Sequence, residues 1–254
     1  MIKQNPLQKN KTRMNVLVID VGGTHVKLKV TAGNDERRSF DSGRKLTAQK
    51  AVDGIHNIIG DWKYDAVSIG IPAPVINGRI LHDPHNLGIG WVGFDFNAAF
   101  GCPVKIINDA AMQALGSYHG GSMLFLGLGT GLGSSMIVDD VIVPMELAHL
   151  PYKKKTFEDY VGIAGLQRLG KKKWRSAVFD VVEVLRAALE PDYVTLGGGN
   201  AELLSDLPDG VETCSNENAF DGGFRLWEDG NVPNNNELKK SVPNRKTKSP
   251  KKQA

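Results

Sequence analysis

The most constraining feature of this sequence is a pattern that occurs once in each half of the chain: an apolar strand, a glycine-rich turn and a second strand. The first copy covers residues 15–30 with its turn at 21–24, and the second covers 123–138 with its turn at 129–133. Helical patterns follow each copy. The sequence therefore predicts a duplicated α/β architecture with a cleft between the two halves.

The remaining predicted elements follow from apolar spacing and from proline and glycine breaks. Residues 71–80 are predicted to form a loop, and a helix is expected after the glycines at 197–199. Strands are predicted at 65–70, 103–107 and 193–196, and helices at 46–59, 110–118 and 174–189.

Composition excludes several classes of protein. With 254 residues, 41% of them hydrophobic and 23% charged, the chain can build a substantial core. Its apolar runs are strand-sized, so we expect no transmembrane helix and no membrane partner. Cys102 and Cys214 are the only cysteines, which excludes a disulfide scaffold and a cysteine-built zinc site. Together with an N-terminus that lacks an apolar signal region, this predicts a cytoplasmic protein.

The net charge of +3 is unevenly distributed. Residues 1–13 contribute +4 and residues 231–254 contribute +6, so residues 14–230 carry −7. Chain ends that are basic and poor in apolar residues are usually solvated and disordered, and we expect both ends of this chain to be so. The alternative is that they bind a partner. No nucleic-acid partner is predicted.

The glycine turns are candidates for phosphate binding, because bare backbone N–H groups can approach phosphate oxygens closely. Gly129–Gly133 leads into a strand rather than a helix, which excludes a dinucleotide fingerprint, and the sequence has no P-loop. Asp20 ends the first strand, where its carboxylate could hold Mg²⁺ or its waters. The alternative is that both turns are ordinary hairpins.

Polar residues after the other predicted strands are candidates for catalysis. Asp109, at the end of a strand, could be a general base or the N-cap of the following helix. Glu146 and His149 stand three residues apart, and Glu158 lies on the next predicted helix. A metal site at Glu146 and His149 lacks further ligands at suitable spacing.

Taken in order along residues 14–230, these motifs resemble the ROK family of sugar kinases. The motifs are Asp20-Val-Gly-Gly-Thr24, Ile71-Pro72, Asn108-Asp109-Ala110, Gly129-Thr-Gly-Leu-Gly133, Glu146-x-x-His149 and Gly197-Gly-Gly199. Asn86 followed by Trp91, together with the missing cysteine cluster, is most similar to the polyphosphate glucokinases of that family. The resemblance implies a two-lobed α/β fold of the actin-like, RNase H-like class with an interlobe cleft.

The resemblance also implies site roles. Asp109 would take the proton from the 6-hydroxyl of glucose or a related hexose, and Asp20 would hold Mg²⁺ through water. The residues that would bind the other sugar hydroxyls are Asn86, Asn108, Glu146, His149 and Glu158. The residues that would cradle the donor phosphates are Gly22, Gly23, Thr24, Gly129, Thr130 and Gly131, with Gly198 and Gly199 near any nucleoside.

The phosphate donor is expected to be polyphosphate or ATP. A long polyanion such as polyphosphate needs a row of cations along its length. The candidate residues are Lys153, Lys154, Lys155, Lys171, Lys172 and Lys173. The alternative is that these lysine runs only form a solvent-exposed surface. Ala73 and Ala148 stand where the family usually has glycine, which affects sugar specificity. The alternatives are an ATP-dependent kinase of another hexose and a catalytically silent sugar sensor, against which the presence of both Asp20 and Asp109 argues.

The expected domains are an N-terminal lobe at 14–110, completed by a last helix at about 220–230, and a C-terminal lobe at 111–219. By resemblance, the protein is expected to be a homodimer.

Overall fold

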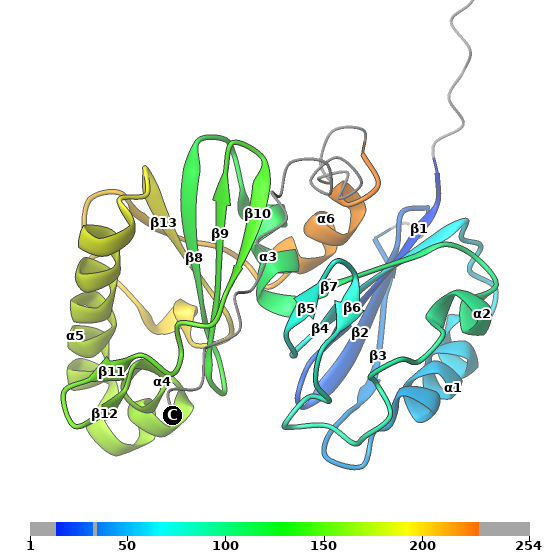
Figure 1. The fold of residues 1–254 in the computed structure, drawn as a ribbon, viewed down its shortest axis with the longest axis horizontal. Helices are drawn as coiled ribbons and strands as arrows, with labels where there is room; N and C mark the ends of the chain where they lie inside the picture. Colours follow the sequence, from blue (N-terminus) through cyan, green and yellow to red (C-terminus); the bar gives the residue numbers. More distant parts are fainter. Residues whose placement is uncertain (1–13, 33–34, 229–254) are drawn as a thin grey trace, which may run out of the picture.

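A computed structural model describes residues 14–32 and 35–228. The basic ends predicted at 1–13 and 231–254 lie outside these residues. Two lobes stand side by side, each built on one sheet (Figure 1). In the part of the chain that the structure describes, no helix is long and apolar enough to cross a membrane.

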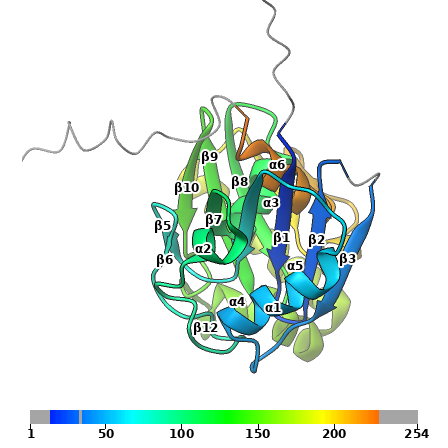
Figure 2. The same cartoon turned by 90° about the vertical axis from the view of Figure 1, so that its right-hand side faces the viewer.

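The first sheet has the order β3-β2-β1-β4-β7. Its central strand β1 pairs antiparallel with β2 and parallel with β4, and all six residues of β4 are buried. The bounds are Val16–Val21 for β1, His25–Val30 for β2, Arg37–Asp41 for β3, Ala66–Ile71 for β4 and Val104–Asn108 for β7. The helices α1, Ala48–Ile59, and α2, Phe96–Phe100, cover the outer face of this sheet (Figure 2).

The second sheet repeats this plan with the order β10-β9-β8-β13-β14. Here β8 is central, antiparallel to β9 and parallel to β13. The bounds are Ser122–Leu128 for β8, Leu132–Val138 for β9, Val141–Met145 for β10, Tyr193–Gly197 for β13 and Val211–Thr213 for β14. The long helix α5, Ile163–Leu189, buries Trp174 and Val178 against this sheet. The two sheets therefore share one topology, as the duplicated pattern predicts.

Small elements complete the fold. A short hairpin, β5 at Val75–Ile76 and β6 at Arg79–Ile80, forms inside the predicted loop at 71–80. A second hairpin, β11 at Pro151–Tyr152 and β12 at Lys155–Thr156, precedes α4, Phe157–Val161.

Some sequence predictions are wrong in detail. The helix predicted at 174–189 is preceded by a further helical segment that begins at Ile163, and the two segments meet at a kink at Gly170, whose φ of +73° is not helical. The helix expected after residue 199 is only a single 3₁₀ turn, Ala201–Leu203. Strands β3, β10 and β14 are missing from the prediction, since they lie at or beside sheet edges and their residues are mostly half-buried or exposed.

Two helices between the sheets join the lobes. They are α3, Asp109–Ser117, and α6, Asn218–Arg225, which lie between the two sheets in Figure 1. Their crossing is close because glycines face backbone: a Cβ on Gly116 would overlap the Asn218 carbonyl, and one on Gly222 would overlap the Met112 carbonyl. Small residues at this crossing are therefore required.

Substituting Gly222 by alanine should destabilise the protein. The added methyl has no room against Met112, and overpacking of this kind typically costs about 1–3 kcal/mol. Urea unfolding of Gly222→Ala measures the change. The matched control is Gly199→Ala, where an added Cβ meets nothing within 4 Å, so its unfolding midpoint should stay near that of the wild type. Equal midpoints for the two variants would contradict the close crossing.

Candidate active site

The junction between β7 and α3 places Asp109 at the interlobe boundary. The Asn108 side chain caps α3, since its Oδ1 accepts the Ala111 N–H at 3.1 Å, while its Nδ2 donates to the Ala73 carbonyl at 3.3 Å. Asp109 is the first helical residue, and its Oδ1 accepts the Ala110 N–H at 2.8 Å. The N-cap role considered for Asp109 therefore belongs to Asn108.

The Asp109 carboxyl has an unusual acidity. Burial, followed by the negative charge of Asp20 and a smaller effect of Glu146, raises the pKa of Asp109 to about 7. Burial also raises the pKa of Asp20, which is partly offset by Lys27, whose Nζ lies 4.0 Å from Asp20 Oδ2. Two carboxyl groups from different elements thus meet at one place, and Asp109 can change protonation near neutral pH.

The first glycine turn lies beside Asn86. The Gly22 N–H donates to the His25 carbonyl at 2.9 Å and closes the turn, and a Cβ on Gly23 would be 3.7 Å from Asn86 Cβ. Thr24 Oγ1 lies 3.1 Å from His25 Nδ1. The structure therefore brings Asn86, predicted to bind sugar, next to a turn predicted to bind phosphate.

The second glycine turn is held by Glu158. The Leu132 N–H donates to Glu158 Oε2 at 3.2 Å, and a Cβ on Gly131 would overlap that carboxylate. Gly129 has nothing within 4 Å of a built Cβ, so space is open above it, and Thr130 is exposed. Glu158 thus contacts the turn directly, a role that the sequence prediction did not include.

The third glycine run braces the second turn. Gly198 has a φ of +80° and packs against the backbone of Leu128, which leaves no room for a side chain. Asn200, which the sequence analysis missed, donates from its backbone N–H to the Leu128 carbonyl at 2.9 Å and from Nδ2 to the Gly129 carbonyl at 3.1 Å. Gly199 has no neighbour within 4 Å of a built Cβ. A polar residue directly after a glycine run is the signal that could have identified Asn200.

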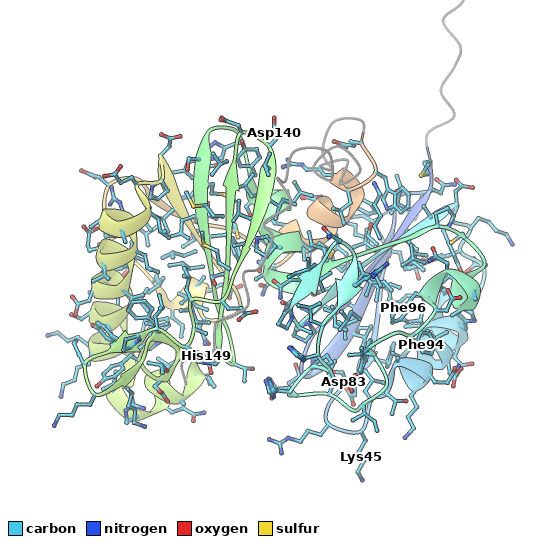
Figure 3. All side chains as sticks on the ribbon, in the orientation of Figure 1. Lys45, Asp83, Phe94, Phe96, Asp140 and His149 are labelled. Carbon is cyan, nitrogen blue, oxygen red and sulfur yellow. The ribbon has the colours of Figure 1, made fainter. Side chains whose placement is uncertain are left out.

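Glu146 and His149 lie on the loop after β10, and both are exposed. Ser134 Oγ fixes the start of this loop, because it donates to the Met145 carbonyl and accepts the Leu147 N–H, each at 3.1 Å. In Figure 3, His149 lies on the side of its lobe that faces the other lobe.

A cavity of about 150 Å³ lies between the β5–β6 hairpin of one lobe and strands β9 and β10 of the other. Most of its lining is apolar, with two polar groups predicted to bind sugar, Asn108 and Glu146. The lining residues are Pro74, Val75, Ile76, Asn108, Ser134, Pro144, Met145 and Glu146. The proline and methionine walls were not identified from sequence.

The β11–β12 hairpin is held by side chains. Tyr152 donates its hydroxyl to Asp180 Oδ2 at 3.0 Å and packs edge-on against the Tyr160 ring, with ring centroids 5.0 Å apart. Lys153 forms an ion pair with the same Asp180 oxygen at 3.2 Å. These contacts tie the hairpin, which follows His149, to α5.

The other lysines predicted as a track are exposed. Lys154 and Lys155 are on the β11–β12 hairpin, and Lys171, Lys172 and Lys173 follow the kink in α5. Within residues 14–32 and 35–228, no group of three or more His, Cys, Asp or Glu side chains could hold a metal ion. A magnesium ion at Asp20 would therefore take most of its ligands from water and donor phosphates, which fits the usual preference of this ion.

Several known proteins are similar in sequence to this chain. Polyphosphate glucokinase of Mycobacterium tuberculosis is 26% identical over 204 residues, which is 71% of this chain and 76% of that protein. The bifunctional enzyme NanE/NanK of Brucella melitensis is 29% identical over 137 residues, or 48% of this chain, and the match spans only 26% of that longer protein.

Among solved structures, the inorganic polyphosphate/ATP-glucomannokinase of an Arthrobacter strain superposes with a TM-score of 0.70 at 22% identity. The match covers 84% of this chain and 98% of that one, and it confirms the predicted two-lobed α/β fold class. The family model described as the ROK family matches residues 16–143, half of the chain and the part that holds Asp20, Asp109 and both glycine turns. This chain belongs to the ROK family.

Proposed function

We propose that this protein is a sugar kinase that transfers a phosphoryl group to the 6-hydroxyl of glucose, with polyphosphate and also ATP as donors. The observation that carries the proposal is the buried Asp109 at the interlobe boundary, whose pKa is raised to about 7 by burial and by Asp20. Gly133, at the end of the second turn, packs against Ala110, the residue after Asp109. The glucokinase and glucomannokinase relatives support the acceptor and the donors. The expected location is cytoplasmic and the expected assembly is a homodimer.

Asp109 is the proposed general base. A carboxylate that starts α3 between the lobes can accept the proton of the sugar hydroxyl as that oxygen attacks the terminal phosphorus, and the phosphate chain leaves on the opposite side. Glu146, Asn108, Asn86, His149 and Glu158 are the proposed partners of the remaining hydroxyls. Glu158 would contact the sugar and also hold the second glycine turn, since it accepts the Leu132 N–H there.

The backbone of the two turns is the proposed phosphate cradle. Gly22, Gly23 and Thr24 border it in one lobe, and Gly129, Thr130 and Gly131 border it in the other, with Gly198 and Gly199 behind. Oriented N–H groups offset charge that develops on the transferred phosphoryl group. Mg²⁺ near Asp20 would add positive charge beside the donor oxygens when it is bound. Lys153, Lys154, Lys155, Lys171, Lys172 and Lys173 are proposed contacts of distal phosphates.

A second candidate acceptor is another hexose. The cavity beside Asn108 and Glu146 is walled mainly by apolar groups, among them Pro74 and Met145, and an apolar wall favours a substituent over a bare hydroxyl. Comparing kcat/KM for glucose, mannose and N-acetylated hexoses separates the two candidates. A preference for an N-acetylated sugar would favour the second.

Asp109→Asn should lower turnover by about 10²- to 10⁴-fold, because asparagine keeps the size and the oxygen acceptor but cannot take a proton. A coupled assay for glucose 6-phosphate measures kcat, and calorimetry shows whether glucose still binds. The unfolding midpoint above pH 7 should not fall, since the raised pKa means that the ionised Asp109 carboxylate disfavours the folded state there. Normal turnover with reduced stability would mean that Asp109 is structural.

The pH profile should reveal the Asp20–Asp109 coupling. The base must be ionised, so kcat/KM for glucose should rise with pH through about 7 in the wild type. Asp20→Asn removes the negative charge that helps raise the pKa of Asp109, so the acidic limb should move to lower pH even though activity is reduced. Lys50→Gln, on the exposed face of α1, is the control. An acidic limb at the same pH in Asp20→Asn would contradict the coupling.

Glu146→Gln should weaken glucose binding by about tenfold or more, which corresponds to a lost hydrogen bond to a charged group. Glu146 is exposed and Ser134 holds the loop through backbone groups, so folding should be unaffected. Calorimetric titration with glucose measures the change. Unchanged affinity would remove Glu146 from the sugar site.

A further inference from the structure

A groove of about 370 Å³ lies on strands β2 and β3, next to the first glycine turn. It is lined by His25, Lys27, Arg37, Arg38 and Ser39. No part of the site described above uses Arg37 or Ser39. Four of the five lining side chains end in a basic group and the fifth ends in a hydroxyl, so the chemistry of the groove suits an extended anion.

The strand register places the lining side chains other than Arg38 on the face of the sheet that carries Asp20. Lys27 pairs with Asp20 on one side and with Ser39 on the other, so the three side chains share that face. His25 directly follows Thr24 and lies two residues before Lys27, about 7 Å along the strand. The groove therefore starts at the turn proposed to hold the reacting phosphates and leads away from it.

The available positive charge comes from three side chains. The Arg38 guanidinium donates to the carbonyls of Ile58 and Ile59 and is committed to that contact. Lys27 and Arg37 remain 45% and 54% exposed. The third cation, when protonated, is His25.

Each of these cations has an acidic neighbour that a polyanion would have to displace or outweigh. Lys27 Nζ is 4.0 Å from Asp20, Arg37 pairs with Glu217 at the start of α6, and His25 Nε2 is 3.5 Å from Asp41. Exposed ion pairs such as these contribute little stability, so little is lost when a cation leaves its carboxylate partner. A cation that then contacts several phosphate groups gains stronger, charge-assisted hydrogen bonds.

We propose that this groove binds the phosphates of linear inorganic polyphosphate that lie beyond the reacting one, with Arg37 as the principal cation. The inference rests on the proposed function, because it extends the donor site from the Gly22–Thr24 turn. It gives the chain a donor subsite in the N-terminal lobe, separate from the lysines of the β11–β12 hairpin and α5. Glu217 competes for Arg37 and thereby weakens polyphosphate binding.

Opposite substitutions of the Arg37–Glu217 pair test this subsite. The dissociation constant of long-chain polyphosphate is measured on the full chain by isothermal titration, at several salt concentrations. Arg37→Gln should weaken binding about tenfold, because one phosphate contact is lost. For the same reason, the logarithm of the association constant should fall less steeply with the logarithm of the salt concentration, by a slope difference of roughly one. Arg37→Lys keeps the charge and should bind nearly as well as the wild type. Glu217→Gln frees the guanidinium and should strengthen binding.

A purely structural ion pair gives a different pattern, since both Arg37→Gln and Glu217→Gln would lower the unfolding midpoint without opposite effects on polyphosphate. That result, or dissociation constants equal to that of the control Lys50→Gln, overturns the proposal. So does a loss of polyphosphate binding only in the triple variant of Lys171, Lys172 and Lys173 to glutamine. Glucose phosphorylation is assayed in parallel with polyphosphate and with ATP. The absence of glucose 6-phosphate with both donors in the wild type would refute the proposed function, whereas the binding data judge the groove independently.

Discussion

The crossing of α3 and α6 is the contact on which the rest of the structure depends. Gly116 and Gly222 let the two backbones touch, and Gly223 lets α6 lie against Val18 in the central strand of the first sheet. On its other side, α3 packs on the second sheet, where a Cβ at Gly133 would lie 2.8 Å from Ala110 Cβ. One helix is thus fixed to both lobes, and Asp109 is its first residue.

That placement explains the electrostatics of the candidate site. Asp109 follows the carboxyl end of β7, and Asp20 lies near the carboxyl end of β1, with only β4 between these strands. Asp20 is near enough to raise the pKa of Asp109, although burial raises it more. Lys27 is 4.0 Å from Asp20 and cannot fully compensate two carboxylates. The two carboxyl groups thus leave a net negative charge in the site. Such a site suits a substrate that binds together with a cation, as a phosphate donor binds with Mg²⁺.

Much of the fold could be predicted because its strongest signals are local. Residues 25–30 alternate strictly, and the structure has β2 at the same residues. The duplicated topology followed from two strand–turn–strand patterns. What failed depended on tertiary contacts. The sequence of β3 is Arg-Arg-Ser-Phe-Asp, and it is a strand because it pairs with β2. The helical segment before the kink at Gly170 was not predicted either.

The candidate site shows the same division. Spacing identified Asp109 and Glu146 as chemically interesting, but it could not decide between a cap and a base at Asp109, since that depends on which side chain reaches the Ala111 N–H. Asn200 was not identified from sequence because its hydrogen-bond partners, Leu128 and Gly129, are distant along the chain. Pairings across the fold, such as Glu158 with the second turn, are not encoded in any local pattern.

The central claim is that a sugar hydroxyl attacks a phosphate donor at the lobe boundary. The most direct measurement is ³¹P NMR of the wild-type protein with Mg²⁺, glucose and either polyphosphate or ATP, which follows the donor and identifies the product. The account predicts that a glucose 6-phosphate resonance grows as terminal phosphate groups are consumed. Release of inorganic phosphate alone, or no change with glucose and every other hexose tested, would contradict it.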